Sequence, residues 1–105
     1  MGLSLRTTAT VAVLLGSAPV WAGSATVTIN DFPFSPASIS VHPGDRVTWN
    51  NQDSEPHTAT ARDGKSFDTG AIDPGVSVSL VFPKRGEFVY HCAIHPEMVG
   101  TVEVW

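Results

Sequence analysis

The sequence predicts an all-β domain of about seven or eight short strands, arranged as an antiparallel sandwich or barrel. Apolar and polar residues alternate over short stretches, most clearly over 76–82, and this period of two is that of a strand with one buried face. Pro, Gly and Asp separate these stretches at regular intervals, as they do in sandwiches and barrels. After residue 22 no window has the 3.6-residue period of an amphipathic helix.

The alternation also places the individual strands. The segment 32–36 contains two prolines, which donate no ladder hydrogen bond, so we do not expect a central strand there. The segment 42–45, His-Pro-Gly-Asp, is expected to be a turn. The expected strands are 25–30, 38–41, 46–50, 76–82, 87–92 and 99–105, with 57–61 extended and 62–74 a loop.

Residues 1–22 have the pattern of a secretory signal peptide. Arg6 supplies the positive start, 9–20 is an apolar run, and Val20 and Ala22 are small residues at −3 and −1 of a cleavage site. The apolar run is shorter than the ~20 residues that span a bilayer. We therefore expect cleavage after Ala22, export to the periplasm without a membrane anchor, and one domain over 23–105.

Charge and cysteine content narrow the function further. Without Arg6, five basic residues stand against ten acidic ones, a net charge of −5. Nucleic-acid-binding domains carry basic stripes, so we expect no nucleic acid, whereas a partner with a positive or neutral surface suits this charge. A single Cys allows no internal disulfide. A lone thiol in an oxidising compartment is a liability unless it is protected from oxidation or has a function, so Cys92 is a candidate functional residue.

Three soft donors follow one another at a spacing of three residues: Cys92, His95 and Met98. A thiolate, an imidazole and a thioether together favour copper over calcium or magnesium. His57, after Pro56, is the candidate second imidazole. Two His and one Cys with a long axial Met form a type 1 (blue) copper site, so the sequence predicts one copper ion held by these four side chains.

The spacing has a mechanical reason. Cys92 ends an expected strand, and the chain must turn sharply to bring His95 and Met98 back to the same ion, with Pro96 stiffening the turn. Reaching His57 closes a loop of about 35 residues, which costs roughly 1.5 kcal/mol more than the six-residue loop. We therefore expect the folded sheet to hold His57 in place before copper arrives.

These segments resemble those of a known family, the cupredoxins, in particular the amicyanin and plastocyanin branch. The resemblance lies in Val41-His42-Pro43-Gly44-Asp45-Arg46-Val47-Thr48-Trp49-Asn50, in Pro56-His57 and in Tyr90-His91-Cys92-Ala93-Ile94-His95-Pro96-Glu97-Met98. It implies a Greek-key β-sandwich and a periplasmic electron shuttle. Thr58 stands where the family often has an Asn that bonds across the site, and Ala93-Ile94 stands where Thr-Pro is common in amicyanin.

Other polar and aromatic residues have ordinary explanations. His91 should point to the strand face opposite Cys92, and His42 lies in an exposed turn. The acidic residues form no tight run and are expected to be a solvated surface. Four aromatic residues are expected in the core, namely Trp49, Phe82, Phe88 and Tyr90.

The predicted function is single-electron transfer by a monomer that docks transiently with a redox partner, a dehydrogenase or cytochrome, near His95. We expect no enzyme, because such a copper ion has no open coordination position. Three alternatives stay open: a copper carrier or chaperone, a thiol enzyme with Cys92 as nucleophile, and a structural zinc site. Met98 counts against a structural zinc site, because zinc prefers Cys and His ligands. A thiol enzyme would give the thioether of Met98 no role.

Overall fold

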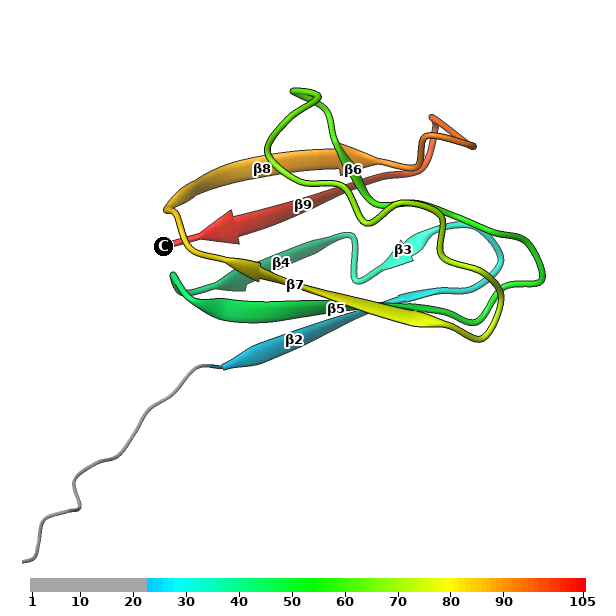
Figure 1. Cartoon of the computed structure of the whole chain (residues 1–105), viewed down its shortest axis with the longest axis horizontal. Helices are drawn as coiled ribbons and strands as arrows, with labels where there is room; N and C mark the ends of the chain where they lie inside the picture. The colour runs from blue at the N-terminus through cyan, green and yellow to red at the C-terminus, as the bar shows by residue number, and fades with distance from the viewer. Residues whose placement is uncertain (1–22) are drawn as a thin grey trace, which may run out of the picture.

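The computed structural model describes residues 23–105, which form a two-layered β-sandwich (Figure 1). The predicted signal peptide and its cleavage site after Ala22 lie outside the described residues, apart from Gly23. The eight strands of the sandwich are β2 (Ser24–Ile29), β3 (Phe34–Ser35), β4 (Ser38–Val41), β5 (Asp45–Asn51), β6 (Thr60–Ala61), β7 (Ser77–Phe82), β8 (Gly86–His91) and β9 (Val99–Val104). The described chain contains no helix, and thus none that could cross a membrane.

The strands form two four-stranded sheets, in the orders β3-β2-β5-β7 and β4-β9-β8-β6. The predicted all-β sandwich is thereby confirmed. Most neighbouring strands are antiparallel, but β2 pairs with β5, and β4 with β9, in parallel. Alternation within a strand reveals which face is buried but not the direction of the neighbouring strand, so the parallel pairs could not be read from it.

The core lies between the two sheets and is built from the alternate residues of each strand. In β5 the odd positions Val47, Trp49 and Asn51 are fully buried, while their neighbours are partly or fully exposed. Trp49 and Tyr90 are the largest fully buried side chains, and their rings meet edge to face at 5.5 Å. As predicted, Phe82 is also buried, whereas Phe88 packs partly buried against the core.

Most expected strands agree with the structure to within a residue. The expected extended segment 57–61 is shorter than predicted, because only Thr60–Ala61 belongs to a sheet and His57 forms an isolated bridge with Ile72. The segment 32–36 contributes the two-residue edge strand β3, which agrees with the exclusion of a central strand by its prolines.

The direction of the strands decides which loops meet. β2 and β5 run toward one end of the sandwich, and β8 runs toward the same end, so their following loops gather there, at the right of Figure 1. The chain end at Trp105 and the β7–β8 turn lie at the other end, at the left. The predicted copper-binding residues all belong to the loops at the right-hand end.

Candidate metal centre

The structure brings three of the four predicted ligands together. The candidate donor atoms of His57, Cys92 and His95 lie within 4.8 Å of one another. Cys92 Sγ lies 3.8 Å from Nδ1 of His57 and 4.0 Å from Nδ1 of His95. His57 and Cys92 are fully buried, and Met98, only 5% exposed, belongs to the same core cluster as Cys92.

These separations fit a small metal ion. Two donors at about 2.0 Å (N) and 2.3 Å (S) from one ion, 120° apart, would lie about 3.7 Å from each other. Both measured distances between sulfur and nitrogen are close to that value. A buried thiolate, two imidazoles and a nearby thioether are the donor set of a trigonal copper site with an axial Met, so the residues present fit copper.

Two backbone hydrogen bonds fix His57 before any metal binds. Its N–H donates to the Ile72 carbonyl at 3.1 Å, and its carbonyl accepts from the Ile72 N–H at 2.7 Å. On the ring, Nε2 is 2.8 Å from Oδ2 of Asp53, which leaves Nδ1 facing Cys92. The hydrogen bond from His57, together with the N–H of Ser54, lowers the pKa of Asp53, which keeps this carboxylate charged.

Thr58 ties the first histidine to the cysteine. Its backbone N–H donates to Cys92 Sγ at 3.3 Å, and its Oγ1 accepts from the Ala93 N–H at 2.8 Å. The hydroxyl thus bonds across the site, at the position where the family often uses an Asn. Such contacts orient the ligands and hold the sulfur, and they are part of what tunes a metal centre.

The loop 92–98, which we call the Cys–Met loop, closes on itself. The N–H of Cys92 donates to the Met98 carbonyl at 3.1 Å, and the N–H of Met98 donates to the His95 carbonyl at 2.9 Å. These bonds bring the ends of the loop together and make a turn over 95–98. The predicted sharp turn is present although Ala93-Ile94 contains no proline.

Sequence reasoning missed Phe32, which covers the site from the β2–β3 connection. Its ring packs edge-on against His95, with ring centroids 4.6 Å apart, and against His57 at 5.4 Å. Its backbone has a φ of 87°, which is rare for a bulky residue and strained. The two prolines around Phe34 gave no sign of this role, because only the packing of three separate loops brings Phe32 to the histidines.

A second missed residue is Asn51, which is fully buried at the end of β5. Its Nδ2 donates to the carbonyls of Glu55 and Ile72, both at 2.8 Å, and its Oδ1 accepts from the Asp53 N–H at 2.9 Å. These bonds shape the loop 52–56 that leads to His57. A polar residue at an inward position of an alternating strand was the available signal, since a buried amide needs partners.

The carboxylate of Glu55 lies beside the other histidine. Its Oε1 is 3.4 Å from His95 Nε2, on the ring side away from Cys92. The loop 52–56 therefore offers one carboxylate to each histidine, Asp53 to His57 and Glu55 to His95. The sequence alone showed two acids two residues apart but not that they face different rings.

The remaining histidines lie outside the cluster. His42 is exposed, 3.8 Å from Asp45 Oδ2 in the turn before β5. His91 ends β8 on the face opposite Cys92 and is half-buried, and its Nδ1 has no partner within residues 23–105. The expectation that neither contributes to the metal centre agrees with the donor cluster found in residues 23–105.

Comparisons with known proteins agree with this geometry. Residues 7–104 match the family model described as a Cupredoxin-like domain. The chain is 32% identical over 92 residues to amicyanin from Paracoccus denitrificans, covering 84% of this chain and 70% of amicyanin. It is 35% identical over 74 residues to the methylamine utilization protein MauL from Methylophilus methylotrophus, covering 67% of this chain but only 42% of MauL.

A solved structure agrees with these sequence matches. The purple cupredoxin from Nitrosopumilus maritimus superposes with a TM-score of 0.70 at 29% identity. The match covers 77% of this chain and 99% of that one, so the likeness extends over the complete sandwich.

Proposed function

The chain belongs to the cupredoxin-like family, its cofactor is copper, and we propose that it is a periplasmic single-electron carrier. In this proposal His57, Cys92, His95 and Met98 would together hold one type 1 copper ion. Copper supplies the chemistry, the exchange of one electron between Cu(I) and Cu(II). The protein supplies a site that keeps its shape, so little rearrangement accompanies that exchange.

One observation carries the proposal: two imidazole nitrogens lie 3.8 and 4.0 Å from a fully buried thiol. Each of the three side chains is fixed by the sheets or by a closed loop. A donor set already in place cannot rearrange freely to suit each oxidation state, and this favours rapid electron transfer. The buried cysteine is also protected from the oxidising compartment in which we place the protein.

The test is to add cupric salt to the metal-free protein and to record its visible and EPR spectra. We expect an intense blue thiolate-to-copper band with narrow hyperfine splitting. The variant Cys92→Ser should lose the band, while His42→Ala, which changes a distant exposed histidine, should keep it. A wild-type protein that stays colourless, with a sulfhydryl that still reacts freely, would overturn the proposal.

We place this protein outside the enzymes. A nucleophilic thiol needs access to its substrate, but Cys92 is fully buried and its sulfur accepts the Thr58 N–H. Iodoacetamide distinguishes the two functions: a ligand in the copper-loaded protein is shielded, whereas a nucleophile is labelled. Structural zinc is disfavoured because the thioether of Met98 is a poor zinc ligand.

The alternative function is that of a copper carrier or chaperone for another exported protein. Such a protein must release its ion readily, whereas here the donors are buried and held by the fold. We therefore expect the bound copper to stay in place when an apo-acceptor is added. Transfer within minutes would favour the carrier.

Export is proposed from residues 1–22, with cleavage before Gly23. The Gly23 N–H donates to Asp45 Oδ1 at 2.8 Å, so cleavage there would place the new terminal ammonium beside this carboxylate. A side chain in place of Gly23 would meet Asp45 at 3.3 Å. N-terminal sequencing of the protein from a periplasmic fraction tests this, and a mature chain starting elsewhere would contradict it.

We propose that the protein works as a monomer and exchanges electrons with redox partner proteins at the end that carries His95. The side chain of His95 is 20% exposed, whereas His57 is fully buried. Of the two histidine ligands, His95 therefore offers an electron the shorter path to the protein surface. Sedimentation of the copper-loaded protein tests the oligomeric state, and a stable dimer covering His95 would contradict it.

A further inference from the structure

Negative charge is distributed unevenly over this molecule. Residues 23–105 carry ten acidic and five basic side chains. Five of the acidic residues lie on the loops that surround the proposed copper site, which we call the copper end: Asp31, Asp53, Glu55, Asp73 and Glu97.

Two of these carboxylates contact the candidate ligands, as described above for Asp53 and Glu55. The other three are exposed, and each is adjacent in sequence to a residue of the site. Asp31 precedes Phe32, whose ring packs on both histidines. Asp73 follows Ile72, the bridge partner of His57, and Glu97 lies within the Cys–Met loop.

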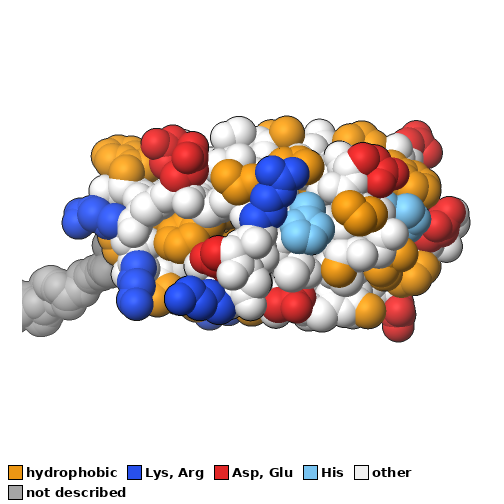
Figure 2. All heavy atoms as spheres, turned by 90° about the horizontal axis from the view of Figure 1, so that it is seen from above, with side chains coloured by type: hydrophobic (Ala, Val, Ile, Leu, Met, Phe, Trp, Pro, Cys, Tyr) orange, Lys and Arg blue, Asp and Glu red, His pale blue; other side chains and the backbone are white. Residues whose placement is uncertain are grey.

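The basic residues lie elsewhere. Arg46 is five residues before the copper end of β5, about 17 Å away at 3.3 Å per residue. Lys84 and Arg85 lie in the β7–β8 turn at the opposite end, and Arg62 and Lys65 lie in the loop after β6. On the face drawn in Figure 2, most blue side chains lie toward the left and one group near the middle, while no blue appears at the right-hand end, where several red side chains lie.

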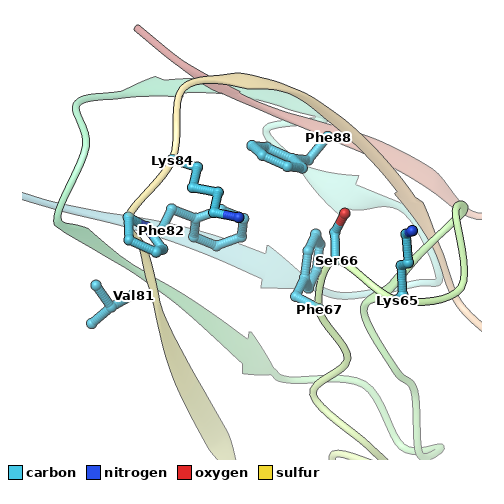
Figure 3. Close-up of a pocket in the computed structure, with 8 residues that line it drawn as sticks. Lys65, Ser66, Phe67, Val81, Phe82, Lys84 and Phe88 are labelled. Atoms are coloured by element: carbon cyan, nitrogen blue, oxygen red, sulfur yellow. The ribbon is translucent and has the colours of Figure 1, made fainter.

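Both lysines of the chain flank a different hollow. Phe67, Phe82 and Phe88 line a space of about 360 Å³. Figure 3 shows Lys65 and Lys84 beside it. Lys65 therefore lies along the side of the sandwich and Lys84 at the end opposite the copper end. The five basic residues balance the five acidic residues outside the copper end, so the net charge of −5 belongs to the copper end.

An apolar surface lies within this acidic rim. Ile94, within the Cys–Met loop beside His95, and Val99, directly after this loop, are 47% and 37% exposed. A shallow hollow of about 310 Å³ opens beside Val99 and is also lined by Phe32 and Met98. Apolar surface surrounded by charge is typical of protein interaction sites.

We propose that the copper end docks a redox protein whose own electron-exchange face is positively charged around an apolar centre. This inference rests on the proposed function and names the kind of partner that suits it. The apolar surface around His95 makes the close contact, and the five carboxylates attract and orient the partner from a distance. Complementary charge raises the rate of encounter more than the affinity.

The same negative charge disfavours contact between the copper ends of two copies of the chain. Two copper ends facing each other bring two rims of like charge together, which slows their encounter. Added salt screens both effects, with a Debye length of about 8 Å at physiological ionic strength. Salt should therefore slow exchange with a positive partner and accelerate exchange between two copies.

The experiment measures electron exchange of the copper-loaded protein by stopped flow, with a basic c-type cytochrome as the positive probe. Self-exchange between reduced and oxidised copies is measured by NMR line broadening. The variant Asp31→Asn/Glu97→Gln removes two charges from the exposed rim without touching a proposed ligand, and Asn tolerates the φ of 55° at position 31. Glu87→Gln/Glu103→Gln is its matched control, removing an exposed cross-strand pair from β8 and β9.

For wild type we expect the cytochrome rate to fall about tenfold between low and high salt, and self-exchange to rise. The rim variant should lower the cytochrome rate at low salt several-fold more than the control does. Electron-exchange rates that do not change with salt concentration, or equal effects of the two variants on the cytochrome rate, would overturn the docking proposal. Those results would leave electron transfer itself intact, whereas a protein without the blue band would overturn the proposed function.

Discussion

At the scale of single residues, the metal centre depends on how each histidine is held. Each ring offers Nδ1 to the thiol, and its other nitrogen faces a carboxylate from the loop 52–56. A carboxylate on the outer nitrogen fixes the ring and raises the basicity of the coordinating nitrogen. The two contacts differ in quality: the one at His57 is buried and 2.8 Å long, and the one at His95 is half-exposed and 3.4 Å long.

The first prediction concerns Asp53. Replacing it by Asn removes the charge beside His57, so we expect the copper affinity to fall about 10- to 100-fold. Competition with a chelator of known affinity measures this. Asp73→Asn, which removes an exposed charge from the same end, is the matched control. An equal loss in both variants would show that general charge, and not the hold on His57, governs affinity.

At the scale of the strands, close packing between neighbours explains a glycine in β9. Gly100 pairs with Tyr90 of β8, and a Cβ at position 100 would come within 2.4 Å of the tyrosine ring and hydroxyl. Tyr90 is fully buried against Trp49 and cannot move aside. The ring thus occupies the space that a side chain at position 100 would need. Burial also raises the pKa of Tyr90 to about 12, so its hydroxyl stays neutral.

The second prediction follows from this contact. Gly100→Ala should lower the free energy of unfolding by about 1–3 kcal/mol, because the added methyl overpacks the core. Chemical denaturation of the metal-free protein measures the loss. Combining it with Tyr90→Leu should cost less than the sum of the two single changes, since the smaller residue leaves room. Strict additivity would show that the two positions are not in tight contact.

The third prediction concerns the turn that joins β4 to β5. Asp45 accepts the N–H groups of His42 and Gly23, each at 2.8 Å, and these bonds lower its pKa from 3.8. Because the folded pKa lies below the unfolded one, the stabilisation is complete above the unfolded pKa. It is lost as the pH falls through the folded pKa.

Urea unfolding of wild type and Asp45→Asn between pH 7 and pH 3 measures this effect. We expect wild type to be the more stable near neutral pH and the difference to shrink toward pH 3. Glu103→Gln, which removes an exposed charge from β9, is the control. A difference that stayed constant over the whole range would contradict the role of the charged carboxylate.

At the scale of the whole molecule, the sandwich does not need the metal to form its core. Fourteen residues form one buried apolar cluster between the sheets, and among the proposed ligands it includes only Cys92 and Met98. The backbone bonds of His57 to Ile72 also form without an ion. The protein therefore differs from small zinc-dependent domains, whose folding requires the metal.

The fourth prediction follows. The metal-free protein should unfold cooperatively, and copper should raise its Tm, with a gain of about 4 kcal/mol at a thousandfold excess over Kd. Calorimetry with and without copper measures both. The rise should vanish in Cys92→Ala and persist in His42→Ala. A metal-free protein with no cooperative transition would show that copper, and not the apolar core, holds the sandwich together.

The sequence by itself determined the all-β class and was enough to propose the donor set. The alternation of apolar and polar residues indicates directly which residues are buried. A thiol, an imidazole and a thioether at fixed spacing can likewise be recognised within one short stretch of sequence. Only the tertiary structure decided which β-pairs are parallel, that Phe32 covers the histidines, and that Asp53 and Glu55 face different rings. It also gathered at one end acidic residues that the sequence spreads from 31 to 97, which we had expected to form an ordinary solvated surface. These features arise between segments far apart in the chain, and their positions depend on sheet topology, which local patterns do not encode.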